Sequence, residues 1–203
     1  MAKIDFKPGN MLYPLPVVMV SVADNSGKTN IVTVAWTGTI NSDPAMISIS
    51  VRKERFSYNM IKESGEFCVN LTNKDIARAT DFCGVRSGRD TDKWKEANLT
   101  PIPASVIKAP MIKESPVNIE CKVIKSEDLG SHTIFYGEVV AVHVDDKYMD
   151  ETGRFHFEDT NPLAYSHGQY YTLGENIGKF GYSVKKETKK KPKKKAPVKK
   201  PSK

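Results

Sequence analysis

Short β-type runs separated by turn signals occupy most of this chain, and this alternation restricts the folds that it can adopt. Leu15 to Ala23 is rich in β-branched residues, Asp24 to Gly27 has turn composition, and Asn30 to Ile40 follows as a second run, so the three together predict a β-hairpin. Ala45 to Arg52 alternates large apolar with small polar residues, which is typical of a half-buried strand.

The rest of the chain adds more strands but only small helices. A short helix is expected to begin at Ser57 as its N-cap and to stop at Gly65, and a second helix is expected over Asn73 to Phe82, capped by Asn73. Further strands are predicted over Glu66 to Leu71, Pro116 to Lys125 and Thr133 to Val144. Many closely spaced strands with few small helices favour a β-barrel or sandwich with helical inserts, and disfavour a Rossmann fold.

The positive charge of the chain is concentrated at its C-terminus. The formal net charge is +7, but residues 185–203 hold 11 lysines and one glutamate, a net of +10, so residues 1–184 carry −3. This Lys/Pro-rich tail is expected to be disordered. It has no interleaved aromatic residues, so sequence-specific nucleic-acid binding is not predicted. Non-specific contact with nucleic acid, with an acidic protein or with an anionic membrane and a purely solubilising role all remain open, and the target of the tail is unknown.

The cysteines and the apolar runs predict a cytoplasmic protein. Cys68, Cys83 and Cys121 form no C-x-x-C pair and are odd in number, which fits a reducing compartment and predicts no metal site. No signal peptide is visible at the N-terminus, and the longest apolar run, Val17 to Val22, is too short to span a membrane.

One polar segment, Asp81 to Lys93, has the composition of an irregular anion-binding loop. Its glycines allow the backbone to approach a ligand closely, while Arg86, Arg89 and Lys93 are cationic donors suited to a phosphate. A solvated connecting loop is the competing interpretation, since no Walker-type or G-x-G-x-x-G spacing is present.

Five blocks of sequence, in order, resemble the flavin reductase-like, FMN-binding split-barrel family, and the flavoredoxin-like proteins in particular. The blocks are Asn30 to Pro44, Ser50 to Asn59, Cys83 to Lys93, Gly130 to Val139 and Tyr165 to Gly174. Each block alone is a weak signal, but five in the same order form a specific pattern.

The resemblance implies a mainly β fold over residues 1–184, a six-stranded antiparallel Greek-key split barrel with small helices. It also implies a homodimer with FMN near the subunit interface, and electron transfer through FMN from NADH or NADPH or from a redox protein partner. One alternative is a flavin reductase that releases reduced flavin to a second component. The other is a non-catalytic flavin-binding dimer scaffold whose basic tail binds an acidic partner.

The same blocks predict which residues contact the phosphate and the flavin ring of FMN. A phosphate dianion needs a cation, hydroxyls and backbone N–H groups, which Arg52 and Ser57 are expected to supply from one side and Ser87, Gly88 and Lys93 from the other. The flavin ring needs an apolar shelf with backbone hydrogen bonds. The residues predicted there or elsewhere along the cofactor are Val34, Ala35, Trp36, Thr37, Gly38, Ser50, Val51, Asn59, Cys83 and Gly84.

His132 is the candidate catalytic residue. A histidine in the matching motif of flavin reductases lies near the flavin and the nicotinamide, although this chain has Ser131 where an Asp is commoner. A solvated loop histidine is the competing interpretation. For Trp36, the backbone of its neighbours is favoured over its ring as the contact with flavin. Glu120 alternates with apolar residues and is expected to point outward.

Overall fold

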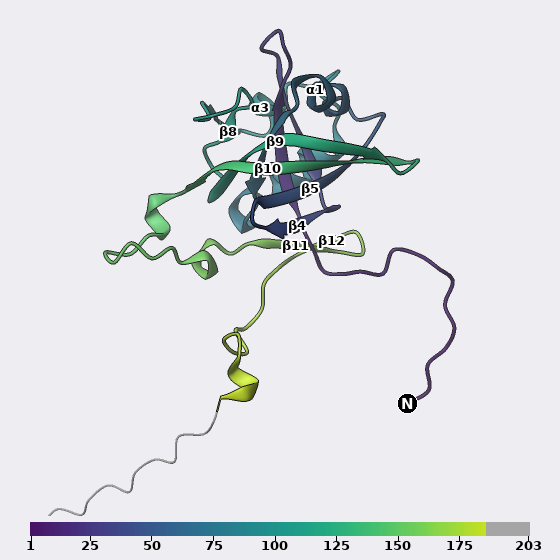
Figure 1. Ribbon diagram of the computed structural model, residues 1–203, viewed down its shortest axis with the longest axis vertical. Coiled ribbons are helices and arrows are strands. Elements are labelled where there is room, and N and C mark those ends of the chain that lie inside the picture. The colour runs from purple at the N-terminus through teal and green to yellow at the C-terminus, as the bar shows by residue number, and fades with distance from the viewer. Residues whose placement is uncertain (186–203) are drawn as a thin grey trace, which may run out of the picture. The chain divides into compact units, whose positions relative to one another are not determined.

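Seven antiparallel strands form one strongly curled sheet, the main feature of the computed structural model, which describes residues 1–185 (Figure 1). The strand order is β3-β2-β6-β9-β10-β5-β4. A small sheet, β1-β11-β12, and a two-stranded sheet, β7-β8, accompany it. The sheets are not closed, and strand makes up 41% against 18% helix, so the predicted mainly β split barrel is confirmed.

The bounds of the elements are as follows. The strands are β1 Leu15–Pro16, β2 Val18–Ala23, β3 Thr29–Val34, β4 Thr37–Ser42, β5 Ala45–Arg52, β6 Glu66–Leu71, β7 Pro101–Ile102, β8 Met111–Ile112, β9 Val117–Asp128, β10 His132–Val144, β11 Leu163–Ser166 and β12 Gln169–Thr172. The α-helices are α1 Ser57–Ser64, α2 Ala77–Val85 and α3 Lys93–Glu96, and the 3-10 helices are η1 Lys74–Ile76, η2 Asp146–Tyr148, η3 Phe157–Thr160 and η4 Tyr182–Val184.

The second predicted strand is two strands, which is why the main sheet has seven members rather than six. The chain breaks between β3 and β4 at Ala35 and Trp36, where the Thr37 N–H donates to the Ala35 carbonyl at 3.0 Å. The Ser50 N–H donates to the Trp36 carbonyl at 2.8 Å, so the break is fastened to β5. Directly after the break β4 pairs with β5 as the edge strand of the sheet, with Thr37 opposite Ile49.

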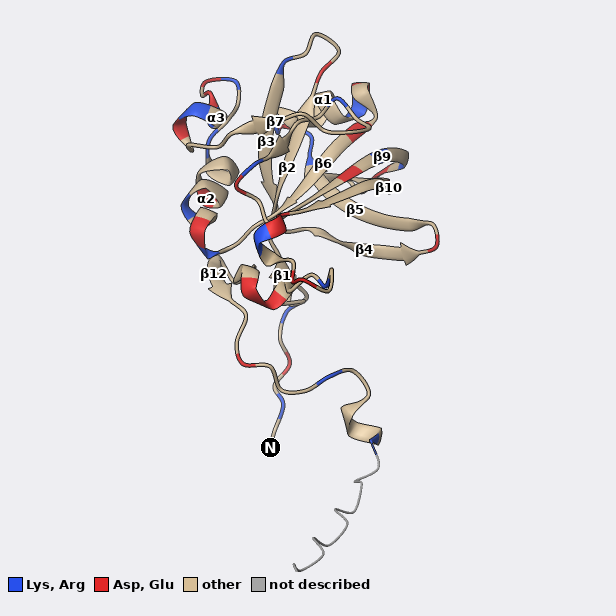
Figure 2. Cartoon of the chain, turned by 90° about the vertical axis from the view of Figure 1, so that its left-hand side faces the viewer, with Lys and Arg blue, Asp and Glu red and all other residues tan. Residues whose placement is uncertain are grey.

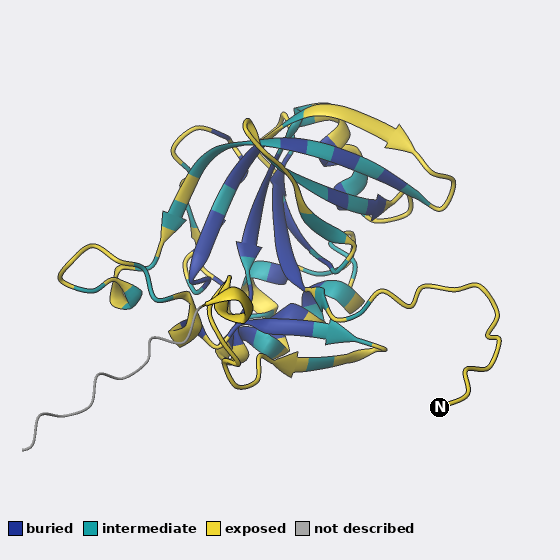
Figure 3. Ribbon diagram, turned by 60° about the horizontal axis from the view of Figure 1, so that its bottom comes forward, coloured by how far each residue is buried: buried dark blue, intermediate teal, exposed yellow. Residues whose placement is uncertain are grey.

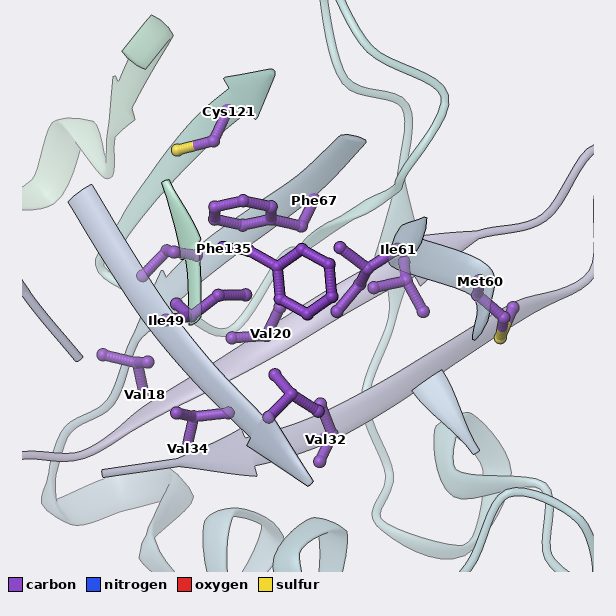
Figure 4. Packing of buried hydrophobic residues seen from close by; sticks show 13 residues of the cluster. Val18, Val20, Val32, Val34, Ile49, Met60, Ile61, Phe67, Cys121 and Phe135 are labelled. Carbon is purple, nitrogen blue, oxygen red and sulfur yellow. The ribbon is translucent and has the colours of Figure 1, made fainter. Parts of the chain in front are cut away.

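The core lies inside the curl of the main sheet, where buried side chains of β2, β3, β5, β6 and β10 meet those of α1 (Figures 3 and 4). Phe67 and Phe135 are its largest fully buried side chains. Gly137 lies at a bulge between β10 and β9, where an added Cβ would stand 2.5 Å from the Phe67 ring. Glycine at this position therefore lets the long β9–β10 hairpin cross closely over the core.

The helices depart from the sequence prediction in two respects. Ser57 is the first residue of α1 and not its N-cap; its hydroxyl caps nothing, because it is paired with a side chain of β3 instead. The predicted loop at Asp81 is helical as far as Val85, since α2 continues to that residue. The Asn73 cap is confirmed: its side-chain oxygen accepts the Ile76 N–H at 3.2 Å.

Residue contacts divide the chain into two compact units, one from Met1 to Leu173 and one that begins at Gly174. The predicted domain boundary at residue 184 and the basic tail after it stay predictions, because the tail lies outside the described residues beyond Lys185. Within residues 1–185 no helix has the length and apolar character needed to cross a membrane.

Candidate functional site

Two adjoining cavities bring most of the predicted site residues together. The smaller one, about 240 Å³, lies where α1 starts and where the chain passes from α2 to α3. Its wall combines four cationic side chains with hydroxyl and amide groups. It is lined by Asn30, Val32, Glu54, Arg55, Phe56, Ser57, Val85, Arg86, Ser87, Gly88, Arg89 and Lys93.

Ser57 presents an unused hydrogen-bond donor to the smaller cavity. Its side chain is fully buried, and its Oγ accepts a hydrogen bond from the Asn30 amide nitrogen at 2.8 Å. Among residues 1–185 no acceptor lies within hydrogen-bonding distance of the Ser57 hydroxyl hydrogen. Since a buried O–H normally donates, this hydrogen is available to an acceptor inside the cavity.

Lys93 is a buried cation on the same wall. Its Nζ donates to the backbone carbonyls of Ile31 at 2.7 Å and Cys83 at 2.8 Å, and the residue is only 4% exposed. Burial lowers the pKa of Lys93 to about 8, with a smaller effect from the nearby Arg55. No carboxylate pairs with this ammonium among the described residues, so an anion in the cavity would be its first counter-charge.

Two arginines of the cavity wall are also held by backbone carbonyls. Arg55 Nη1 donates to the Gly84 carbonyl at 2.9 Å, and Arg89 Nη1 donates to the Glu54 carbonyl at 3.0 Å. The Arg89 guanidinium also lies 5.6 Å from the centre of the Phe56 ring. These contacts orient both guanidinium groups without neutralising them.

Gly88 closes the cavity against Asn30. A Cβ added at Gly88 would stand 2.2 Å from Asn30 Oδ1, so no larger residue fits without displacing the amide that holds Ser57. Glycine is therefore required at this position, because the loop backbone approaches the Asn30 side chain closely, as expected for a loop that also brings its backbone against a ligand.

The larger cavity, about 490 Å³, continues from the smaller one, because Val32, Arg55 and Val85 line both. Its remaining wall comes from β3, β5, α2, the start of β10 and the β11–β12 hairpin. The other lining residues are Asn10, Val17, Thr33, Val34, Ala35, Trp36, Ser50, Val51, Arg52, Asp81, Gly84, Ser131, His132, Tyr165, Gly168 and Tyr170.

Trp36 and His132 form a planar aromatic wall of the larger cavity. Their rings are 6.3 Å apart and inclined by only 12°. Burial lowers the pKa of His132, and the neighbouring Arg52 lowers it further, so the imidazole is neutral at pH 7. Ser131 Oγ lies 2.9 Å from Nδ1 of His132, which leaves Nε2 free for a ligand among the described contacts.

Tyr165 and Tyr170 line the same cavity from the β11–β12 hairpin, with ring centres 5.8 Å apart in an edge-to-face arrangement. Tyr170 Oη donates to Asp81 Oδ1 on α2 at 3.0 Å. Burial raises the pKa of Tyr170 to about 12, and the hydrogen bond to Asp81 contributes to the rise. The tyrosine therefore remains a donor throughout the physiological pH range.

Most of the predicted cofactor residues line one of the two cavities. The predicted residues that line the smaller cavity are Ser57, Ser87, Gly88 and Lys93. Those that line the larger cavity are Val34, Ala35, Trp36, Ser50, Val51, Arg52, Gly84 and the proposed catalytic His132. Arg52 was expected at the phosphate end but lies at the end of the larger cavity, where its register partner is His132.

Four predicted residues do not reach a cavity wall. The Thr37 hydroxyl donates to the Ser48 carbonyl, and Gly38 follows it along β4, away from the cavities. Asn59 is exposed on α1. Cys83 is a fully buried residue of α2, and burial raises the pKa of its thiol to about 11, so only its carbonyl, bonded to Lys93, serves this region.

Several cavity residues were not predicted as part of the site. Arg55 lines both cavities, Asn30 positions Ser57, and Asp81 and Tyr170 join two walls of the larger cavity. No local pattern marks these residues, since each acquires its role from a segment distant in sequence.

Comparisons with known proteins agree with this arrangement. The family described as flavin reductase like domain matches residues 10–174. A flavoredoxin structure from Desulfovibrio vulgaris (Miyazaki F) is similar at a TM-score of 0.84 and 31% identity, covering 91% of this chain and 100% of that one. A flavoredoxin structure from Methanosarcina acetivorans is similar at a TM-score of 0.79 and 28% identity, covering 90% and 100%.

A protein of Archaeoglobus fulgidus is 30% identical over 139 residues, which is 68% of this chain and 77% of that protein. The family match spans every strand, the three α-helices and both cavities of the described residues. The chain therefore belongs to the flavin reductase-like domain family.

Proposed function

We propose that this protein is an FMN-binding flavoprotein oxidoreductase that passes electrons from NADH or NADPH, or from a redox protein partner, to an acceptor. The observation that carries the proposal is that a cationic cavity and an aromatic cavity adjoin each other. One offers cations without carboxylate partners and an unused hydroxyl donor, and the other is lined by aromatic rings, of which those of Trp36 and His132 are nearly parallel. A planar ring system that ends in a phosphate matches both at once.

The smaller cavity fits the phosphate of FMN by the chemistry of its donors. Ser57 Oγ, Lys93 Nζ and the Arg55 and Arg89 guanidinium groups would hold the dianion, with the Ser87–Gly88 backbone closing over it. Because three of these cations are bonded to carbonyls rather than to carboxylates, their charge remains for the ligand.

The larger cavity would hold the flavin ring between its two aromatic walls. Trp36 and His132 lie on one side, and Tyr165 and Tyr170 on the β11–β12 side. When bound, FMN supplies the hydride and electron chemistry. This chain orients the ring, excludes water from it, and through Nε2 of the neutral His132 can hold or release a proton near it.

A homodimer with FMN near the subunit interface belongs to the same proposal. It is supported by large apolar side chains that one chain leaves exposed close to the larger cavity. Met11 and Leu12 precede β1, Trp36 lines the cavity itself, and Ile40 lies on the edge strand β4.

The test is the visible absorption spectrum of the purified full-length protein, followed by addition of NADH or NADPH without oxygen. Bleaching of the flavin bands by one nucleotide would support the proposal and name the donor. Bands that persist with both nucleotides would favour an electron carrier fed by a protein, or the flavin-binding scaffold. Absence of flavin bands even after incubation with excess FMN would refute the proposal.

A further inference from the structure

The β11–β12 hairpin forms one wall of the larger cavity but is attached to the barrel mainly along one edge. β11 pairs with β1, and the Leu163 N–H donates to the Thr72 carbonyl at 3.1 Å. The outer strand β12 pairs only with β11 and is exposed apart from Tyr170, which is half-buried. The inner strand is thus anchored, and the turn contacts the chain before β1, where the rings of His167 and Tyr13 are 4.2 Å apart between centres, while within residues 1–185 the outer strand has no other strand beside it.

One side-chain hydrogen bond fastens the outer strand to the rest of the first unit. Within residues 1–173, the only side-chain hydrogen bond from β11 or β12 to another element is that from Tyr170 Oη to Asp81 Oδ1, at 3.0 Å. The two residues are 89 positions apart in sequence. Figure 2 shows β12 next to α2, the helix that carries Asp81.

Both partners of this hydrogen bond line the larger cavity, on two different walls. Tyr165 and Gly168, from the same hairpin, line it as well. If Tyr170 separated from Asp81, the hairpin wall could swing away from α2 while its β1 edge stayed paired. The cavity would then open on the side of the β11–β12 hairpin.

We propose that the Tyr170–Asp81 hydrogen bond is a latch that holds the β11–β12 hairpin over the flavin cavity and slows the release of bound flavin. The inference rests on the proposed function, since it assumes that FMN occupies the larger cavity. Its consequence is that this protein keeps FMN through successive turnovers as a prosthetic group, and does not exchange it with free flavin as a substrate. Both residues act by positioning a wall, not by touching the reacting atoms.

The experiment measures the dissociation rate of FMN from the full-length protein. FMN-loaded protein is diluted far below its dissociation constant, and the return of flavin fluorescence is followed, because aromatic walls quench the bound flavin. Tyr170→Phe and Asp81→Ala are each expected to release FMN about three- to tenfold faster, the effect of one such hydrogen bond. The Tyr170→Phe, Asp81→Ala double variant is expected to be no faster than the faster single variant, because both remove the same contact.

Tyr171→Phe is the matched control. Tyr171 is the next residue of β12 and is exposed, and its hydroxyl bonds only to Gln169 Oε1 at 2.8 Å within the same strand. Its release rate should equal that of the wild type. A second measurement, amide hydrogen exchange in the flavin-free protein, should show faster exchange in residues 165–172 of Tyr170→Phe but not of Tyr171→Phe.

The outcomes separate the latch from the proposed function. If the wild type binds FMN and Tyr170→Phe releases it no faster than Tyr171→Phe, the latch is wrong and the proposed function stands. If the wild type binds no FMN, both are overturned. If Tyr170→Phe lowers the melting temperature of the flavin-free protein without changing the release rate, the hydrogen bond is structural and the latch is wrong.

Discussion

The affinity for FMN should fall as pH rises above about 8, because of Lys93. Burial lowers the pKa of this side chain to about 8 in the free protein, and its ammonium is the buried cation of the smaller cavity, where the proposal places the FMN phosphate. A phosphate dianion beside it favours the charged form and therefore raises the pKa in the complex. Above pH 8 the free protein must take up a proton in order to bind, so each further pH unit weakens binding about tenfold.

The expected size follows from the fraction of Lys93 that stays charged. At pH 9.5 a group with a pKa of about 8 is protonated in roughly 3% of molecules, so the dissociation constant for FMN should be about 30-fold higher than at pH 7. Titration of the protein with FMN, followed by flavin fluorescence, measures this constant. Calorimetry in two buffers of different ionisation enthalpy should show uptake of close to one proton per FMN near pH 9.

Riboflavin is the control ligand, because it lacks the phosphate and should bind with no such pH dependence. The Lys93→Met variant should bind FMN more weakly at pH 7 and lose the slope between pH 7 and 9.5. Equal slopes for FMN and riboflavin, or an unchanged slope in Lys93→Met, would refute the assignment of this lysine to the phosphate.

Three further predictions test the cavity and the core. Ser57→Ala should weaken FMN binding by about tenfold to hundredfold through loss of one charge-assisted hydrogen bond, whereas Ser64→Ala at the other end of α1 should not, as judged by absorbance titration. Gly88→Ala should weaken FMN binding by about tenfold, because the new methyl group needs the space that the Asn30 amide occupies. Gly174→Ala is its control, since a Cβ added there has nothing within 4 Å. Equal affinity for FMN in the two variants would contradict the close approach of Gly88 to Asn30. Burial of the fully buried Glu120 acts to raise its pKa, but its hydrogen bonds outweigh that effect and lower the pKa to about 2. The ionised carboxylate therefore stabilises the fold by about 3 kcal/mol above pH ~4.5, and this contribution is lost as pH falls toward 2. Glu120→Gln should lower the free energy of unfolding, measured in urea at pH 7, by a similar ~3 kcal/mol. In this variant the free energy of unfolding should also fall less between pH ~4.5 and pH ~2 than in the wild type. An equal fall in the two proteins would contradict this account.

The strands were predictable because their signals are local. Period-two alternation over Ala45 to Arg52 and the turn at Asp24 to Gly27 each depend on adjacent residues, and both are present in the structure. The break at Ala35 and Trp36 was missed because Asn30 to Ile40 has strand character throughout. It depends on Ser50, a residue of another strand, which bonds to the Trp36 carbonyl.

Glu120 shows why the polar interior could not be predicted. Its place between apolar neighbours on β9 suggested a solvated face, but residues 105–107 cover that face and donate three backbone N–H groups to its carboxylate. The Ser105 hydroxyl at 2.8 Å and His143 of β10 at 2.7 Å add a fourth and a fifth contact. The carboxylate holds the irregular segment 105–107 against the sheet by hydrogen bonds. The need of this segment for a buried acceptor is seen only in the folded chain.

The smaller cavity illustrates the same limit, and it also shows how the fold keeps four cationic side chains together. The composition of residues 81–93 indicated an anion site, but not that Lys93 would be buried or that Arg55 would join it. Arg55, Arg89 and Lys93 are each held by main-chain carbonyls, at Gly84, Glu54, and Ile31 with Cys83. Carboxylate partners would orient the cations equally well, but they would cancel the field that an anion needs. A cavity whose cations are held by carbonyls is therefore ordered before the ligand arrives. It keeps a net positive charge, because Glu54 is the one carboxylate on its wall and pairs with Arg52, so little of the binding free energy is lost to arranging the site.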